Sequence, residues 1–381
     1  MIQSPAGFLN KHRIEIKAQG LVSRFWLCSE VFNEKQLVKS KTNVMNTTKN
    51  FIGVDVSKKT LDLCVLDAEG RAIGRSRIEN KGKNISEYFE ELQKNQGLNM
   101  RTVLVCLEHT GVYSNLLLEY LSSVQASVCV EMALQIKRSQ GIQRGKSDKL
   151  DALRIAEYAH LHHRKLRLWA PTRKQVQELK ALAALRDRLV RVANQLRVSL
   201  KENEEFIDYE IQKEVKSGCK ASLKALEKDL KKVDEKINKL ISKDENLTKQ
   251  MKLLTSVTGI GRAIATQMII STNEFQMIKE PKKFACYAGV APFEHSSGTS
   301  IKSKPRVSKM ANMEMKKLLY LGATSAIQYS EEMKAYYERK IAVGKKPLSV
   351  INAVRNKLIS RAFVCINQNR AYEKIFKRVL V

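Results

Sequence analysis

The chain has 381 residues, which is enough for two or three domains. It contains only 17 Gly and 6 Pro, so a turn-rich β-sandwich or propeller is disfavoured, and its 43% hydrophobic content excludes general disorder. The 68 Lys and Arg outnumber the 39 Asp and Glu, which gives a net charge of +29. Such an excess indicates a polyanionic partner, because Lys and Arg that neutralise phosphates release condensed counterions.

The chain shows no signal for a membrane or for secretion. No apolar run approaches the roughly 18 residues that cross a bilayer, and the N-terminus lacks the apolar stretch of a signal peptide. The seven cysteines are scattered, odd in number and without a Cys-x-x-Cys pair. We therefore expect a cytoplasmic protein with reduced cysteines and no membrane partner.

The first half of the chain predicts a leader followed by an α/β domain. Residues 1–48 have no sustained hydrophobic period and are expected to be a leader or extension outside the folded part. Strands are then expected at 51–57, 60–67, 71–79, 102–108 and 126–131, and helices near 83–95 and 113–123. Three hairpin-linked strands followed by alternating helices and strands are typical of a ribonuclease-H-like mixed sheet covered by helices, which we assign to residues 49–170.

A coiled-coil helical region is expected at residues 171–245. The stretches 174–201 and 221–244 hold almost no Gly or Pro, and the second repeats apolar residues at alternating spacings of three and four. This heptad pattern predicts an antiparallel hairpin or a coil that bridges subunits, and an ordinary helical domain remains an alternative.

The last part, residues 246–381, is expected to be a mostly helical domain with one phosphate-binding turn. Gly259-Ile260-Gly261 lies between two apolar runs and is followed by Arg262. A Gly-x-Gly turn between short helices directs backbone N–H groups at a phosphate, as in a helix-hairpin-helix motif, although the same pattern also serves as a plain helix break.

Four acids are candidates for a metal site. Asp55 lies in the middle of an apolar strand and Glu108 ends another, where a carboxylate is costly unless it is paired or bound to a cation. Asp148 and Asp151 are three residues apart at the start of the helix that begins near Ser147, so both project from one face. Four carboxylates suit Mg²⁺ or Mn²⁺ and phosphoryl transfer, whereas the helix-start pair alone also fits acids favoured by the helix dipole. Asp62 and Asp67 are expected to face solvent or to lie in a turn.

Residues 287–310 form the most unusual loop-like segment. Hydroxyl side chains cluster around Ser296, Ser297 and Gly298, and a basic run follows at Lys302, Lys304, Arg306 and Lys309. Hydroxyls beside Gly in a basic loop suit phosphate contact, and an activated one can attack a phosphodiester. An ordinary Ser/Gly loop remains the alternative.

These segments together resemble the transposases of the insertion-sequence one-ten family, also described as bridge-RNA-guided recombinases. The resemblance covers residues 50–370. It is carried by FIGVDVSKKTLDLCVLD, CLEHTG, KSDKLDA, SVTGIG, FACYAGVAPFEHSSG and VSKMAN, in that order along the chain. The chain departs from the family at Ala311, where a Gly is usual, and in its long leader.

The resemblance implies a RuvC-like domain whose DEDD carboxylates, Asp55, Glu108, Asp148 and Asp151, bind Mg²⁺ or Mn²⁺, and a C-terminal transposase domain whose nucleophile is Ser297. The implied activity is transposition of an insertion sequence, with DNA strands cut, held on serine and rejoined. The implied partners are DNA, a guide (bridge) RNA and further copies of the chain, as a dimer or tetramer. The implied location is a bacterial or archaeal cytoplasm, in association with the nucleoid.

Two alternatives stay open at this stage. In the first, the chain is a RuvC-type, metal-dependent, structure-selective nuclease in which water attacks and the serine loop only grips phosphate. In the second, it is a non-catalytic nucleic-acid-binding protein, for which the charge of +29 and the coil suffice.

Overall fold

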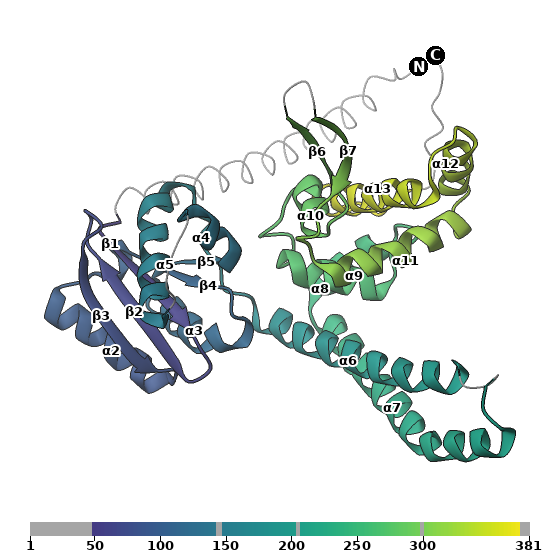
Figure 1. Cartoon of the computed structure of the whole chain (residues 1–381), viewed down its shortest axis with the longest axis horizontal. Coiled ribbons are helices and arrows are strands. Elements are labelled where there is room, and N and C mark those ends of the chain that lie inside the picture. The colour runs from purple at the N-terminus through teal and green to yellow at the C-terminus, as the bar shows by residue number, and fades with distance from the viewer. Residues whose placement is uncertain (1–47, 142–146, 203–205, 298–300, 374–381) are drawn as a thin grey trace, which may run out of the picture. The chain divides into compact units, whose positions relative to one another are not determined.

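The computed structural model describes residues 48–141, 147–202, 206–297 and 301–373. The chain divides into two compact units, one ending at Pro171 and one beginning at Thr172, and each is described by itself (Figure 1). The predicted leader, residues 1–48, lies almost entirely outside the described residues. The predicted division into four parts stays a prediction.

The first unit is built on a five-stranded mixed sheet. Its strands are β1 (Asn50–Val56), β2 (Thr60–Leu66), β3 (Ala72–Glu79), β4 (Val103–Glu108) and β5 (Ser127–Glu131). Their spatial order is β3-β2-β1-β4-β5; β1, β2 and β3 pair antiparallel, whereas β4 and β5 run parallel to β1. This order and these directions confirm the predicted ribonuclease-H-like fold.

Helices cover both faces of this sheet (Figure 1). They are α2 (Gly82–Gln96), α3 (Asn115–Ser123), α4 (Ala133–Ser139) and α5 (Asp148–His162). One face packs its apolar side chains against α2 and α3, and the other packs against α4 and α5. The buried cysteines of β2, β4 and β5 belong to the second of these cores, so they serve as small apolar residues, as the sequence predicts.

The contact between β1 and α5 depends on a missing side chain at Gly53. A Cβ atom at this position would lie 2.2 Å from the backbone N of Ala156 and 2.3 Å from the backbone O of Ala152. The helix backbone therefore rests directly on the strand backbone. Any larger residue at 53 would push α5, and the two acids at its start, away from the sheet.

The second unit begins with two long helices, α6 (Lys174–Glu202) and α7 (Tyr209–Lys243). Cross-helix ion pairs join Arg186 to Asp234 and Arg197 to Glu227, both at 2.6 Å, so the helices run antiparallel. The predicted antiparallel hairpin is therefore present, and its coiled-coil supercoiling stays a prediction. The second helix starts twelve residues before the predicted residue 221, because residues 209–220 continue it without the apolar repeat.

The rest of this unit is helical with one two-stranded hairpin. Its helices are α8 (Glu245–Thr255), α9 (Arg262–Thr272), α10 (Pro281–Tyr287), α11 (Met313–Tyr329), α12 (Glu331–Ala342) and α13 (Pro347–Asn367). Strands β6 (Pro292–Ser297) and β7 (Ile301–Val307) occupy most of the segment predicted as an irregular loop. Among the described helices, none is long and apolar enough to cross a bilayer.

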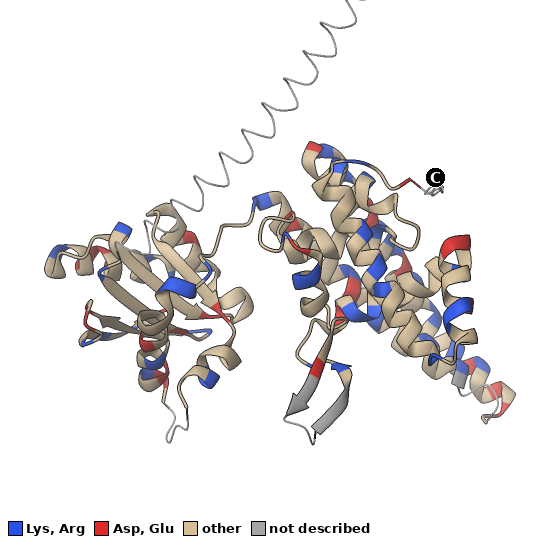
Figure 2. Cartoon of the chain, turned by 90° about the horizontal axis from the view of Figure 1, so that it is seen from above, with Lys and Arg blue, Asp and Glu red and all other residues tan. Residues whose placement is uncertain are grey.

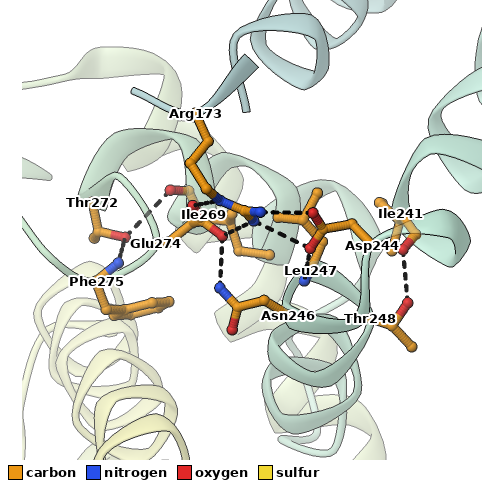
Figure 3. Close-up of polar contacts among 10 residues, drawn as sticks. All are labelled: Arg173, Ile241, Asp244, Asn246, Leu247, Thr248, Ile269, Thr272, Glu274 and Phe275. Carbon is orange, nitrogen blue, oxygen red and sulfur yellow. Dashed lines mark hydrogen bonds and ion pairs between the residues drawn. The ribbon is translucent and has the colours of Figure 1, made fainter. Parts of the chain in front are cut away.

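Arg173, just before α6, connects three parts of this unit (Figure 3). Its guanidinium donates at 2.8 Å to Asp244, which caps α8, and at 2.8 Å to Glu274, which follows α9. The Glu274 side chain is only 2% exposed and also accepts from Asn246 at 2.7 Å. Hydrogen bonds from Arg173 hold the pKa of Asp244 below its usual value. Arg173 therefore ties the start of α6 to the junction of α7 with α8 and to the loop after α9.

We expect Arg173→Ala to lower the free energy of unfolding by about 3 kcal/mol, because it leaves the buried Glu274 carboxylate without its charge partner. This is the low end of the range for a broken buried ion pair, since Arg173 itself is 41% exposed. Chemical denaturation measures the change. Arg197→Ala, which removes an exposed pair, is the control and is expected to change stability by less than about 0.5 kcal/mol. Equal effects of the two variants would contradict the assignment.

Candidate active site

Four acids project from one face at one end of the sheet. Asp55 of β1 lies opposite Asp62 of β2, and the pairing of Val54 with Leu107 brings Glu108 of β4 beside Asp55. Glu131 of β5 in turn pairs with Glu108. Because side chains alternate along a strand, Asp55 shares its face with Gly53, and that face carries α5.

Helix α5 adds two more acids to this end of the sheet. Ser147 caps the helix by accepting from the N–H of Leu150 at 3.3 Å, and Asp148 and Asp151 lie in the first turn. Burial and the charges of four acids raise the pKa of Asp55 to about 6; in decreasing order these acids are Glu108, Asp151, Asp148 and Asp62. The structure thus brings all four predicted carboxylates together, from elements far apart in the sequence.

Two arginines pair with the carboxylates of this cluster. Arg77 of β3 lies 2.8 Å from Asp148 and 3.3 Å from Asp62, and Arg154 lies 2.9 Å from Asp151. Within the described residues, no three acid, histidine or cysteine side chains are arranged so that they could hold a metal ion as they stand. The arginines therefore hold three of the carboxylates, those of Asp62, Asp148 and Asp151, in ion pairs.

Asp62 is buried, which corrects the expectation that it faces solvent. The residue is 3% exposed, and its pairing with Asp55 places it on the face of the sheet that carries α5. Its Oδ1 atom is buried and has no hydrogen-bond partner among the described residues. Burial raises the pKa of Asp62, and the charge of Arg77 only partly opposes this.

The chemistry of this cluster fits a divalent cation. Carboxylate oxygens are the ligands that Mg²⁺ and Mn²⁺ prefer. The raised pKa of Asp55 indicates negative charge that the described residues leave uncompensated, and the Oδ1 atom of Asp62 is an acceptor without a hydrogen-bond partner among them. A cation bound at this point would relieve both.

The hairpin that carries Ser297 has a closely packed base. The N–H of Asn312 donates to the carbonyl of Tyr287 at 2.8 Å, and its side chain donates to the Tyr287 hydroxyl at 2.7 Å. Gly289 has a φ of +64°, and a Cβ there would lie 2.4 Å from the Cβ of Ala311. The Ala311 methyl, where the family usually has Gly, therefore fills the space that Gly289 leaves. Both ends of the segment are held together at this contact.

The backbone of Ser297 ends β6 and pairs with Ile301 of β7. The side chains of Ser297, Lys302 and Lys304 lie outside what the structure describes. Arg306 is exposed on β7, and Lys309 is exposed just beyond it. The predicted roles of these residues stay predictions.

The Gly259–Gly261 turn joins α8 to α9, as expected of a helix-hairpin-helix motif. Gly261 caps α9, and both it and Arg262 are exposed at that helix N-terminus; Arg262 also donates to Asn238 of α7. Gly259 differs: it has a φ of +96°, and a Cβ there would lie 2.5 Å from the carbonyl O of Gly322 in α11. Packing against α11 explains this glycine. Its predicted contact with nucleic acid stays a prediction, as do those of Gly261 and Arg262.

A basic groove lies between α6 and α7, in a unit whose helices carry many Lys and Arg (Figure 2). Its charged lining residues are Arg197, Lys201, Lys213, Lys216, Lys220, Lys224 and Glu227. Glu227 pairs with Arg197, which leaves a strongly positive surface of the kind that attracts a phosphate backbone. The sequence analysis did not single out this surface.

Comparison with known families decides what kind of protein carries these features. A family model described as a transposase, DEDD_Tnp_IS110, matches residues 52–203, and one described as "Transposase IS116/IS110/IS902 family" matches residues 251–338. The chain belongs to this family of transposases. The resemblance found in the sequence is confirmed, and the protein is a DNA transposase or recombinase.

Individual relatives of this transposase cover almost its whole length. The "Pilin gene-inverting protein" of Moraxella bovis is 27% identical over 332 residues, which is 86% of this chain and 98% of that protein. A protein of the same name from Moraxella lacunata matches equally well, at 27% identity over 332 residues. Among solved structures, Thermus thermophilus RuvC shares 15% identity with a TM-score of 0.25, over 32% of this chain and 99% of that one.

Sequence reasoning missed Asp62 and Glu131 as members of the acidic cluster. The signal was present for both. Asp62 lies in an apolar strand just as Asp55 does, and Glu131 ends β5 just as Glu108 ends β4. What the sequence did not supply was the register that places them on the same face of the sheet.

We expect Asp55→Asn to stabilise the metal-free protein at pH 8 by roughly 2 kcal/mol, less than the roughly 3 kcal/mol of the full pKa shift, because Asp55 is only half-buried and solvent screens its charge. The folded-state pKa of about 6 exceeds the unfolded value of 3.8, so folding favours the protonated carboxyl. The cost of the ionised group grows as the pH rises from about 4 through 6. The gain from Asn should therefore be full above pH 6 and vanish below about pH 4. Denaturation in EDTA across this range measures it.

Asp67→Asn is the matched control for this prediction. Burial raises the pKa of Asp67, but hydrogen bonds from Arg71 more than offset it, so that its pKa is lowered. Neutralising Asp67 should not stabilise the protein at pH 8. If Asp55→Asn behaved like this control, Asp55 would not be crowded by negative charge.

We expect Gly289→Ala to destabilise the second unit by about 3 kcal/mol, because the new methyl overlaps Ala311 and the backbone has a positive φ. The double variant Gly289→Ala/Ala311→Gly removes the overlap but keeps the backbone strain, so about 1 kcal/mol of the loss should remain. Thermal unfolding of the two variants and of Ala311→Gly alone measures this coupling. Additive effects would show that the two residues are not in contact.

Proposed function

We propose that this transposase cuts and rejoins DNA strands with Ser297 as nucleophile and with a divalent cation on Asp55, Glu108, Asp148 and Asp151. The observation that carries the proposal is the convergence of these four carboxylates, which together with burial raises the pKa of Asp55 to about 6. Repulsion between carboxylates lowers stability, so its retention at one place in the fold indicates a functional site.

The carboxylates supply the ligands for Mg²⁺ or Mn²⁺ in this proposal. When bound, the cation supplies neutralisation of the charge that develops on the phosphate oxygens. Arg77 and Arg154 hold the carboxylates of Asp148 and Asp151 in place and are the residues that must release them. Asp62 of β2 offers a further carboxylate oxygen to this site, its Oδ1 atom, which has no hydrogen-bond partner among the described residues.

The serine supplies the covalent step. The Ser297 hydroxyl loses its proton and its oxygen bonds to phosphorus, while the bond from phosphorus to one deoxyribose oxygen breaks and that oxygen takes up a proton. The phosphodiester energy stays in the serine–DNA bond, so rejoining needs no external energy source. Ser297 and the carboxylates belong to different units of the chain, and the reaction requires that both act on one phosphodiester.

The partners in this proposal are DNA, a guide RNA and further copies of the chain in a dimer or tetramer. The basic groove between α6 and α7 and the exposed turn before α9 are surfaces suited to phosphate backbones. The relatives named as pilin gene-inverting proteins support a reaction that cuts and rejoins DNA, because inverting a gene requires both steps.

A RuvC-type nuclease is the second candidate. The acidic cluster supports it without the serine, since water can attack a phosphodiester beside a metal ion. The further alternative, a protein that only binds nucleic acid, leaves the acidic cluster around Asp55 without a use, and that cluster costs stability.

We expect Ser297→Ala to abolish covalent protein–DNA adducts, because it removes the attacking oxygen. The assay incubates the protein with nicked or junction DNA and Mg²⁺ and separates adducts on a denaturing gel. Ser296→Ala, one residue away, is the matched control and should retain adducts. Strand cleavage without adducts in both the wild type and Ser297→Ala would favour the nuclease.

The same Ser297→Ala protein should still be stabilised by Mn²⁺ in thermal unfolding, whereas Asp55→Asn should lose most of that stabilisation. This second measurement separates the roles of the two residues without relying on activity. Adduct formation by Asp55→Asn at the wild-type rate would remove Asp55 from the site.

A further inference from the structure

Arg355 of α13 is a half-buried cation without a counter-charge among the described residues. Its guanidinium lies 4.9 Å from the ring centre of Tyr320 in α11, and its Nε atom is buried with no hydrogen-bond partner among the described residues. None of the ion pairs found among those residues involves it. Within the part of the chain that the structure describes, its hydrogen bond goes to the Asn352 side chain and is long at 3.5 Å. A buried charge of this kind is costly unless an anion compensates it.

A second arginine on the same helix shows what the fold provides elsewhere. Arg361 also lies over a tyrosine, with 4.8 Å to the ring centre of Tyr372, and it pairs with Glu332 of α12. Arg361 thus has an acidic partner, whereas Arg355 has none among the described residues. Burial lowers the pKa of Arg355, but an arginine keeps its proton at any physiological pH.

Arg355 lies beside the base of the β6–β7 hairpin. Its neighbours Asn352 and Asn356 both donate to the carbonyl of Val290, at 2.9 and 3.0 Å, two residues before β6 begins. The aliphatic Cδ atom of Lys316 in α11 lies 3.6 Å from where a Cβ of Gly289 would be. Arg355 therefore lies on the helix whose two amides hold the point where the chain enters the hairpin that carries Ser297.

We propose that Arg355 binds a phosphate of the DNA backbone next to the serine hairpin. A guanidinium over a tyrosine ring keeps its planar set of donors, which suits two-point contact with phosphate oxygens. The phosphate supplies the anion that Arg355 lacks among the described residues. The proposal rests on the DNA-binding part of the proposed function and does not require that Ser297 is the nucleophile.

The test compares Arg355→Met with Arg361→Met in full-length protein carrying Ser297→Ala, so that no strand is cut. The probe is a short fluorescein-labelled duplex, and anisotropy gives its affinity at several salt concentrations. Arg355→Met should weaken binding about tenfold and reduce the slope of log affinity against log salt by about 1, whereas Arg361→Met should change neither. Arg355→Lys should keep the slope, because it keeps the charge.

Thermal unfolding separates this role from a structural one. Arg355→Met should melt at or above the wild-type temperature, since it removes an uncompensated charge and keeps an apolar stem. Wild-type affinity and slope in Arg355→Met would overturn the inference, as would an equal loss of affinity in Arg361→Met. Adduct formation by wild-type protein tests the serine chemistry independently, so failure of either idea can be told from failure of the other.

Discussion

The direct contact between the backbones of β1 and α5 is the constraint on which the first unit depends. It exists because residue 53 is a glycine, whose missing Cβ leaves room for the backbone at Ala152 and Ala156. Since Asp55 is two residues along the same face, the contact also determines how closely Asp148 and Asp151 approach it. Packing of α5 on the sheet thereby buries part of Asp55 and brings like charges close to it, and burial and these charges together raise its pKa.

In the second unit, a glycine likewise allows close packing at the base of the β6–β7 hairpin. Gly289 and Gly259 each have a positive φ and each accept a neighbouring atom where a side chain would otherwise lie, Ala311 in one case and the carbonyl of Gly322 in the other. Both segments are motifs that the sequence analysis connected with phosphate. Close approach of backbones, rather than long side-chain contacts, therefore positions the functional segments in both units.

Much of this was predictable from the sequence because it depends on local pattern. The alternation of FIGVDV and the apolar run VLVCLE located β1 and β4 and their acids, and Ser147 located the start of α5. The burial of Asp62 required the register of β2 against β1, and the β6–β7 hairpin had too little alternation among its polar residues to be recognised. No local sequence pattern could predict that Arg355 lies over Tyr320 and has no acidic partner among the described residues, because both facts depend on how distant helices pack.

Both units hold charge that their ion pairs do not fully neutralise. In the first unit, burial and the charges of four acids raise the pKa of Asp55, although Arg77 and Arg154 pair with three of these acids. In the second, Arg355 takes part in none of the ion pairs found among the described residues, and its Nε atom has no hydrogen-bond partner among them. Each imbalance lowers the stability of the free protein, so a ligand of opposite charge would stabilise each unit: in the functions proposed here, a cation at the acids and a phosphate at Arg355.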